Sequence, residues 1–293
     1  MGWLRGSFDR LEGRLLAELR TEAAEAGAAA NGSAADCTAA PPQTVGELPP
    51  CVQRYLELAD AASCKYMVLT STQIGQFKYS ADDASPWQRM KVTLSASPSV
   101  PAFHWSARCT FKPLIGMRGS DSRVRGSGRL DWRLWGWLPA HSANGPELDR
   151  TLLVRWLADA PGCPQAMLPS ASLRWEAVPG FESEARAVLS HGGITVSGVF
   201  TFDGEGLVSS FRTDDYVMPL AGGGQERRPW LVRYRGHTRV KVADNTSGGS
   251  GSSSDGDQQG SLFVPTDCEA CRVESSGREV LYVRFQLEKL SSH

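Results

Sequence analysis

The sequence lacks both a long apolar run and an excess of one charge. No segment approaches the ~20 consecutive apolar residues of a membrane-spanning helix, and the first residues contain no continuous apolar stretch of the signal-peptide kind. Lys and Arg total 31 against 32 Asp and Glu, so no overall field attracts nucleic acid or an anionic membrane. We therefore expect a soluble protein with neither a transmembrane segment nor a nucleic-acid partner.

The chain also lacks the short motifs that mark common catalytic and metal sites. It has no P-loop, no GxSxG elbow and no GxGxxG after a strand, and the glycine run at 222–224 has no lysine at the required spacing. None of the five histidines lies four residues from another, as a helical zinc site requires. Cys268 and Cys271 form a single CxxC, whereas structural zinc needs four ligands. We expect no metal, no cofactor and no catalytic residue identified by a motif.

The cysteines do not form the pattern of a secreted disulfide scaffold. There are seven of them, an odd number, and they are scattered over the whole chain. Disulfide-rich secreted domains are short and usually carry an even, clustered set. This pattern predicts reduced thiols and an intracellular protein, with the cytoplasm as the expected compartment.

The N-terminal residues 3–20 are predicted to form an amphipathic helix. Its apolar stripe recurs at steps of three and four residues: Trp3, Leu4, Phe8, Leu11, Leu15 and Leu19. We expect this stripe to dock on the body of the protein. The alternatives are contact with a membrane surface, disfavoured by acidic residues on the polar face, and contact with a partner helix. Residues 21–47 are rich in Ala, Gly and Pro and are predicted to be a flexible linker.

Strand patterns dominate the remaining chain. Apolar and polar residues alternate strictly over 90–96, 103–111 and 194–202, and a last strand is predicted over 281–287. This period of two is typical of antiparallel strands with one face on a core and the other on water. Helices are predicted after Pro50 and, in mid-chain, after Pro146, since proline suits the first helical position.

The predicted fold is α+β and mainly antiparallel β. About ten strands are expected in one large curved sheet or open half-barrel with two or three helices. Residues 48–290 should form a single β-rich domain. Residues 244–261 consist of Gly, Ser, Asp and Gln with almost no apolar side chain, so a disordered insertion between two strands is predicted there.

One set of polar residues is a candidate for chemistry. Asp121 belongs to a dense group of charges that runs to Arg133, and Glu147 and Arg155 lie on the mid-chain helix. Arginines beside aromatic rings can hold a carboxylate or phosphate. Ordinary cross-strand ion pairs are nevertheless the favoured explanation of the first group, and helical pairs such as Arg155 with Asp159 are the favoured explanation of the second.

Several segments, in order, resemble an uncharacterised domain-of-unknown-function family that is widespread in bacteria (the 6544/6920 type). They are residues 48–56 (LPPCVQRYL), 101–107 (PAFHWSA), 145–150 (GPELDR), 153–159 (LVRWLAD), 166–169 (AMLP), 175–178 (WEAV), 200–203 (FTFD) and 229–230 (PW). The chain departs from the family pattern at residues 121–126 (DSRVRG), at residues 162–163 and at Asp159. The resemblance implies no known reaction, and by analogy it suggests a lipoprotein-carrier-like half-barrel whose curved sheet surrounds an apolar cavity.

These patterns favour a binding protein over an enzyme. The first hypothesis is a module that holds an apolar or lipid-like small molecule inside the sheet without catalysis. Its candidate ligand-binding residues are Trp105, Trp132, Arg133, Trp156 and Trp175. The alternatives are an enzyme of unrecognised type using Asp121, Glu147 and Arg155, and a protein-interaction module. No feature of the sequence specifies an oligomeric state.

Overall fold

A computed structural model of the chain describes residues 2–31, 42–78, 85–112, 115–219, 225–244 and 260–292. The α-helices are α1 (Gly2–Asn31), α2 (Pro50–Leu58) and α3 (Pro146–Asp159), with short 3-10 turns at Val45–Glu47, Ala61–Ser63, Ala160–Gly162 and Pro164–Met167. The strands are β1 (Leu69–Phe77), β2 (Gln88–Ala96), β3 (Phe103–Lys112), β4 (Ile115–Val124), β5 (Ser127–Leu134), β6 (Leu138–Asn144), β7 (Leu173–Val178), β8 (Phe181–His191), β9 (Ile194–Phe202), β10 (Val208–Thr213), β11 (Val217–Pro219), β12 (Gln225–Arg227), β13 (Trp230–Arg235), β14 (Thr238–Asp244), β15 (Ser261–Val264), β16 (Asp267–Val273) and β17 (Glu279–Ser292).

One open sheet of 15 strands dominates the described part of the chain. Its main path runs β6-β5-β4-β3-β2-β1-β17-β16-β13-β10-β9-β8-β7, with β14 paired to β15 and β17. The pairs along this path are antiparallel, and β14 meets β17 in parallel. Because β6 and β7 end the path without pairing to each other, the sheet is open and does not close into a barrel. The predicted fold class is confirmed.

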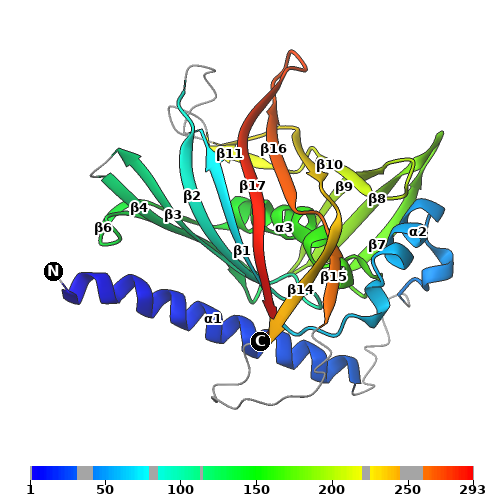
Figure 1. Ribbon diagram of the computed structural model, residues 1–293, viewed down its shortest axis with the longest axis horizontal. Helices are drawn as coiled ribbons and strands as arrows, with labels where there is room; N and C mark the ends of the chain where they lie inside the picture. Colours follow the sequence, from blue (N-terminus) through cyan, green and yellow to red (C-terminus); the bar gives the residue numbers. More distant parts are fainter. Residues whose placement is uncertain are drawn as a thin grey trace.

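The sheet curves around helix α3, as Figure 1 shows. Helix α3 contacts β4, β5 and β6 from one half of the sheet and β8 and β9 from the other. The two halves also meet directly at the fully buried Arg123 of β4. Its guanidinium donates to the backbone oxygen of Pro101 at 2.6 Å and approaches Nδ1 of His191 on β8 at 2.8 Å. This contact joins β4 to β8 and so links the two halves of the curved sheet.

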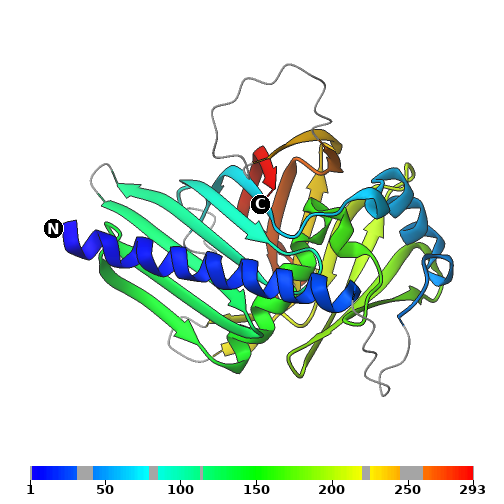
Figure 2. The ribbon, with the colours of Figure 1, turned by 90° about the horizontal axis from the view of Figure 1, so that it is seen from below.

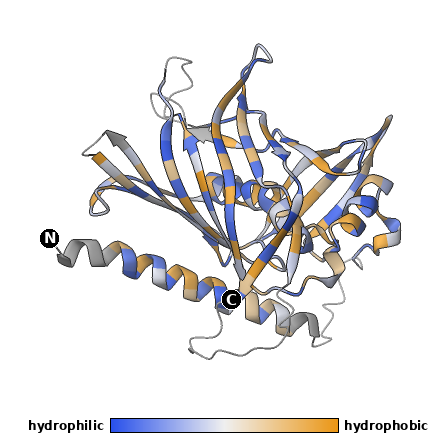
Figure 3. Cartoon of the chain, in the orientation of Figure 1, coloured by the Kyte–Doolittle hydropathy of each residue, from blue (hydrophilic) through white to orange (hydrophobic). Residues whose placement is uncertain are grey.

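The alternation seen in the sequence sets the two faces of the sheet. Hydrophobic and hydrophilic residues alternate along the strands in Figure 3. The predicted strands over 90–96, 103–111 and 194–202 are confirmed as β2, β3 and β9, and both proline-initiated helices are confirmed as α2 and α3. The inner face packs on α3, and the outer face of one half lies under α1.

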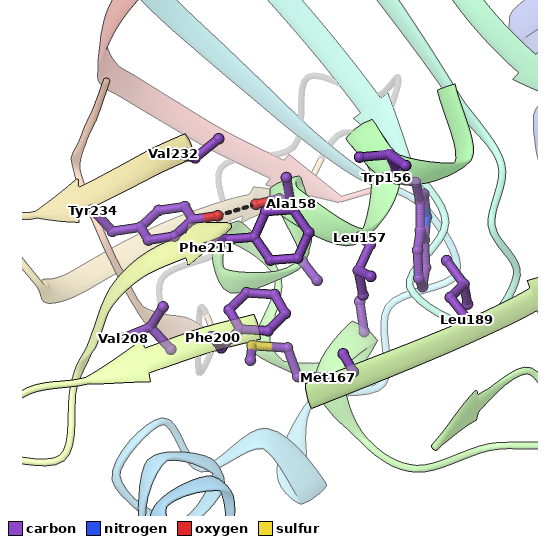
Figure 4. Packing of buried hydrophobic residues seen from close by; sticks show 14 of the residues in the cluster. Trp156, Leu157, Ala158, Met167, Leu189, Phe200, Val208, Phe211, Val232 and Tyr234 are labelled. Carbon is purple, nitrogen blue, oxygen red and sulfur yellow. Dashed lines mark hydrogen bonds between the residues drawn. The ribbon is translucent and has the colours of Figure 1, made fainter. Parts of the chain in front are cut away.

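The interior is filled on one side of α3. Figure 4 shows Leu157 and Met167 packed against Phe200 and Phe211, and all four side chains are almost fully buried. The hydroxyl of Tyr234 on β13 donates to the backbone oxygen of Ala158 at 2.6 Å. The half of the molecule formed by β7–β10 therefore has a solid aromatic core where it faces α3.

Helix α1 crosses the outer face of the sheet (Figure 2) and contacts β3 and β4. Phe8, Leu11 and Leu19 of the predicted apolar stripe are buried. The guanidinium carbons of Arg118 and Arg133 lie 4.7 and 5.3 Å from the centre of the Phe8 ring. The stripe thus docks on the body of the protein.

Polar contacts complete the docking of α1. The carboxylate of Glu12 accepts hydrogen bonds from Ser106 of β3 and from Arg118 of β4, the latter at 2.8 Å. Glu22 accepts from the backbone nitrogen of Arg125 at 2.6 Å. Burial raises the pKa of Glu12, but the nearby His104 ring, the hydrogen bond from Ser106 and the charge of Arg118 together lower it by more, so the net shift is downward. Glu12 is accordingly held as a carboxylate at this interface.

The segment predicted to be a linker differs from that expectation at both ends. Residues 21–31 continue α1, because alanine is the best helix former and six of these eleven residues are alanine. Near the other end, the Gln43 side chain donates to the backbone oxygen of Trp175 at 2.9 Å and accepts from its nitrogen at 2.7 Å. Residues 32–41 lie outside the described residues. So do residues 245–259 of the predicted insertion, whose flanking strands β14 and β15 pair with each other.

Candidate functional site

A cavity of about 530 Å³ lies inside the curve of the sheet, beside α3. Strands β1–β5, β13, β16 and β17 contribute to its wall, and the second half of α3 forms one side. The volume falls in the range of about 300–1,000 Å³ that is typical of small-molecule sites. We take this cavity as the candidate functional site.

Most of the wall is apolar, because the inner face of the strands carries the apolar half of the alternation. Trp105 on β3 and Trp132 on β5 lie with ring centroids 6.0 Å apart. The Trp132 ring lies against Gly119 of β4, where a Cβ atom would overlap it, so glycine is required beneath the indole. Other wall residues are Met90, Leu94, Met117, Leu130, Val283, Phe285 and Leu287. Such a wall is suited to contact with the hydrocarbon part of a ligand.

Trp156 fixes the position of α3 along the wall. Its indole nitrogen donates to the backbone oxygen of Ser97 at 3.0 Å, which joins α3 to the end of β2. The side chain is 5% exposed and still borders the cavity. Trp156 therefore serves as both a packing residue and part of the wall.

A charged group lies where α3 borders the cavity. Arg155 of α3 donates from Nη1 to Oδ2 of Asp121 on β4. Its guanidinium carbon also lies 5.2 Å from the centre of the Trp105 ring. Burial lowers the pKa of Arg155, but the charges of Asp121 and Asp159 raise it, and the net shift is upward. A fixed cation is thereby presented to a mainly apolar space.

Asp159, one helical turn beyond Arg155, lines the same cavity. Surrounding protein raises the pKa of this carboxyl to about 6, although the charge of Arg155 acts in the opposite direction. Its side chain is exposed and borders the cavity. The carboxyl consequently changes protonation state in the mildly acidic range.

Two tyrosines and a second arginine also belong to the polar part of the wall. Tyr216 stacks on Trp230 at 4.4 Å between ring centroids, and the Trp230 indole donates to the Tyr282 hydroxyl at 2.9 Å. Arg272 lies over the Tyr282 ring at 4.5 Å. Burial raises the pKa of both tyrosines, so both hydroxyls keep their protons.

The structure places three of the five candidate ligand-binding residues in the cavity wall: Trp105, Trp132 and Trp156. Arg133 is not part of it, because its neighbour Trp132 faces inward and alternation turns Arg133 to the α1 side, where it pairs with Asp131 at 2.8 Å. Trp175 is buried in the solid core, where its indole nitrogen donates to the backbone oxygen of Met167 at 3.0 Å.

The structure separates the three residues of the alternative polar site, Asp121, Glu147 and Arg155. Asp121 and Arg155 meet in the cavity wall, whereas Glu147 is exposed at the start of α3 and is not part of the wall. The helical pair of Arg155 with Asp159 does not form within 4 Å, because Arg155 reaches across to Asp121 on the sheet. Tertiary contact has replaced the pairing expected from helical spacing.

Sequence reasoning missed Tyr216, Tyr282 and Arg272. Tyr282 reaches the cavity through a β-bulge: the register passes from Ala270 opposite Val283 to Cys271 opposite Leu281. The bulge turns Leu281 to the other face of the sheet, where it packs with Leu231 and Cys271, although it alternates with Val283 and Phe285 in the predicted strand. Strict alternation gives no sign of such a shift.

The CxxC cysteines lie in different apolar clusters. Cys268 borders the cavity and Cys271 packs on the opposite face of β16. Burial raises the pKa of Cys268 to about 12, so this thiol stays protonated.

Within the described ranges, no group of three or more His, Cys, Asp or Glu side chains is placed to hold a metal ion. No helix in the same ranges is long and apolar enough to cross a membrane.

The fold and the site together define a protein with a large open antiparallel sheet that surrounds an apolar cavity beside a central helix. The chain belongs to the family of unknown function DUF6544, whose model matches residues 39–279. The family resemblance seen in the sequence is confirmed, and α1 lies outside the matched residues. No curated protein matches the chain.

Three solved structures are similar to this chain. One is a domain described as an outer membrane lipoprotein-sorting protein from Vibrio parahaemolyticus, with 8% identity, a TM-score of 0.40 and coverage of 84% of this chain and 92% of that one. A DUF1329 family protein from Desulfovibrio piger has 8% identity, a TM-score of 0.33 and coverage of 84% and 93%. A β-barrel-like DUF1849 protein from Brucella abortus has 10% identity, a TM-score of 0.27 and coverage of 78% and 99%.

Proposed function

We propose that this protein binds an apolar or lipid-like small molecule in the cavity inside its curved sheet, as a carrier or sensor and not as an enzyme. The observation that supports this most strongly is the wall itself, a 530 Å³ space bordered mainly by apolar and aromatic side chains. Burial of a hydrocarbon chain against such a surface is favourable by about 25 cal/mol per Å² removed from water. Methionines at positions 90 and 117 add side chains that adapt to ligands of different shape.

Two neighbouring residues of β2 provide a matched test. Leu94 lines the cavity, whereas Thr93 is exposed on the opposite face of the same strand. We would titrate the neutral, apolar dye Nile red against the wild type and against Leu94→Trp and Thr93→Trp. The larger indole at position 94 fills part of the cavity, and at position 93 it points to solvent.

We expect saturable Nile red binding to the wild type and to Thr93→Trp with Kd values within about twofold of each other. Leu94→Trp should weaken binding about fivefold or more, which corresponds to about 1 kcal/mol. Circular dichroism of each variant checks that the sheet is folded. Equal loss of binding in both variants, or no saturable binding to the wild type, contradicts the proposal.

A further inference from the structure

The charged part of the cavity contains the hydrogen-bond donors of Arg155. Arg155 uses Nη1 for Asp121, and in the described part of the chain Asp121 is its sole hydrogen-bond acceptor. The Arg155 side chain is 17% exposed, and it borders the cavity. Since a guanidinium carries five N–H groups in a planar fork, donors remain for an acceptor inside the cavity.

The surroundings hold this guanidinium in place. Asp121 anchors one edge, and the rings of Trp105 and Phe103 lie 5.2 and 5.7 Å from its central carbon. Asp121 is thus a positioning residue, because it holds Arg155 and leaves the rest of the fork for a ligand. A planar, preorganised fork is well suited to a carboxylate, which it can bind through two parallel hydrogen bonds.

Other groups that face this region are also donors or can become donors. The hydroxyls of Tyr216 and Tyr282 stay protonated, and both residues border the same cavity as Arg155. Asp159 donates when its carboxyl is protonated, and it repels an anion when ionised. The titratable or charged groups around Asp159 are Arg155 on its own helix, Tyr234 and Cys268 beside it, and Asp121, Tyr216, Tyr282, Arg272, Glu269, His141 and Lys78 along the cavity wall.

We propose that the cavity selects amphiphiles with a carboxylate head group, such as long-chain fatty acids, by binding the carboxylate to Arg155 and the hydrocarbon tail to the tryptophan-lined wall. This inference rests on the proposed binding function and names its ligand class. Asp159 makes the selection sensitive to pH. Because burial raises the pKa of this carboxyl to about 6, it is mostly neutral at pH 5.5 and anionic at pH 7.5.

Three probes with the same tail and different head groups test this proposal: dodecanoate, dodecan-1-ol and dodecylamine, each below its micellar concentration. Their affinities would be measured by displacement of Nile red from the full-length chain at pH 5.5 and 7.5. We expect dodecanoate to bind at least about tenfold more tightly than dodecan-1-ol at pH 5.5, as one charge-assisted hydrogen-bond pair implies. Dodecanoate affinity should fall about fivefold from pH 5.5 to 7.5, with dodecan-1-ol unchanged.

Two variants assign the effects to residues. Arg155→Gln should weaken dodecanoate about tenfold or more and leave dodecan-1-ol within about twofold, which also shows that the cavity is intact. Asp159→Asn should keep dodecanoate affinity high and remove most of its pH dependence. If Arg155→Gln does not fold, the proposal is tested by comparing Asp159→Asn with the wild type, because that comparison measures how dodecanoate affinity changes with pH.

The proposal is overturned if dodecanoate and dodecan-1-ol bind equally to the wild type, if dodecylamine binds most tightly, or if Asp159→Asn keeps the wild-type pH profile. In each of these cases Nile red and the alcohol still bind, so the binding function stands and the carboxylate class fails. If no probe and no dye binds, both fail together.

Discussion

At the scale of single residues, the neighbouring residues Arg155 and Trp156 of α3 have different roles. Trp156 is held by Ser97 and supports the wall, whereas Arg155 is held by Asp121 and offers charge to the cavity. The sequence pointed to both residues but paired Arg155 with its helical neighbour Asp159. Arg155 instead pairs with Asp121 on β4, which is far away in the sequence. The spacing of residues along one helix cannot predict a contact with another element.

Replacement of Trp156 by alanine should lower the free energy of unfolding by about 3–5 kcal/mol, the usual cost of removing a large buried aromatic side chain. Trp156→Phe keeps most of the buried area and loses the hydrogen bond to Ser97, so about 1 kcal/mol is expected. Urea unfolding followed by circular dichroism measures both. A loss below about 1 kcal/mol for the alanine variant would show that Trp156 does not support the fold.

His191 should make stability depend on pH. Burial, followed by the charge of Arg123, lowers the pKa of His191 in the folded protein below its ordinary value. The unfolded chain therefore binds the proton more readily, and stability that is fully present above about pH 6.5 is lost as the pH falls below it. His191→Asn offers Arg123 a neutral amide that does not titrate.

The free energy of unfolding of the wild type and of His191→Asn would be compared by urea titration at pH 7.5, 6.5 and 5.5. We expect a smaller decrease on acidification in the variant. His237 contributes in the same direction, since burial lowers its pKa too, so a residual decrease is expected. Parallel pH profiles for both proteins would contradict the role given to His191.

At the scale of elements, alternation predicted the strands well and failed where the chain departs from it. The strands over 90–96, 103–111 and 194–202 appear as expected, because a period of two follows directly from strand geometry. Tyr282 was missed because a bulge in β17 exchanges the two faces. Helix α1 is longer than predicted because the alanine-rich run after residue 20 continues the helix.

Docking of α1 should depend on Phe8. This ring is fully buried beneath the guanidinium groups of Arg118 and Arg133, whereas Arg14 lies on the exposed side of the same helix. Phe8→Ala should increase amide hydrogen exchange along α1 by about tenfold or more, since loss of a buried Phe side chain removes at least about 1.5 kcal/mol of burial. Arg14→Ala should leave exchange unchanged. Unaltered exchange in Phe8→Ala would mean that polar contacts alone hold the helix.

At the scale of the whole molecule, the sheet pairs strands from the beginning and the end of the chain. The first strand β1 pairs with the last strand β17, and β17 pairs in turn with β16. If residues 48–290 were divided into two segments at any point between β1 and β17, the division would break the pairing of β1 with β17 or that of β16 with β17. This arrangement supports the prediction from sequence that residues 48–290 form one domain.

Thermal unfolding of the full chain should therefore show one transition. Far-ultraviolet circular dichroism, tryptophan fluorescence and calorimetry should give the same midpoint within error, since one cooperative unit loses all its structure together. The tryptophans report on both halves, because Trp132 lies in the cavity half and Trp175 in the solid core. Two separate transitions would show that the halves around α3 fold independently.

The central claim is that the curved sheet encloses a binding site for a lipid-like molecule. Native mass spectrometry of the full chain, purified without detergent and then incubated with dodecanoate, tests it most directly. We expect one bound amphiphile per chain, either carried through purification or taken up from solution, with occupancy reduced in Leu94→Trp and retained in Thr93→Trp. A wild-type protein that shows only its own mass before and after incubation would contradict the account.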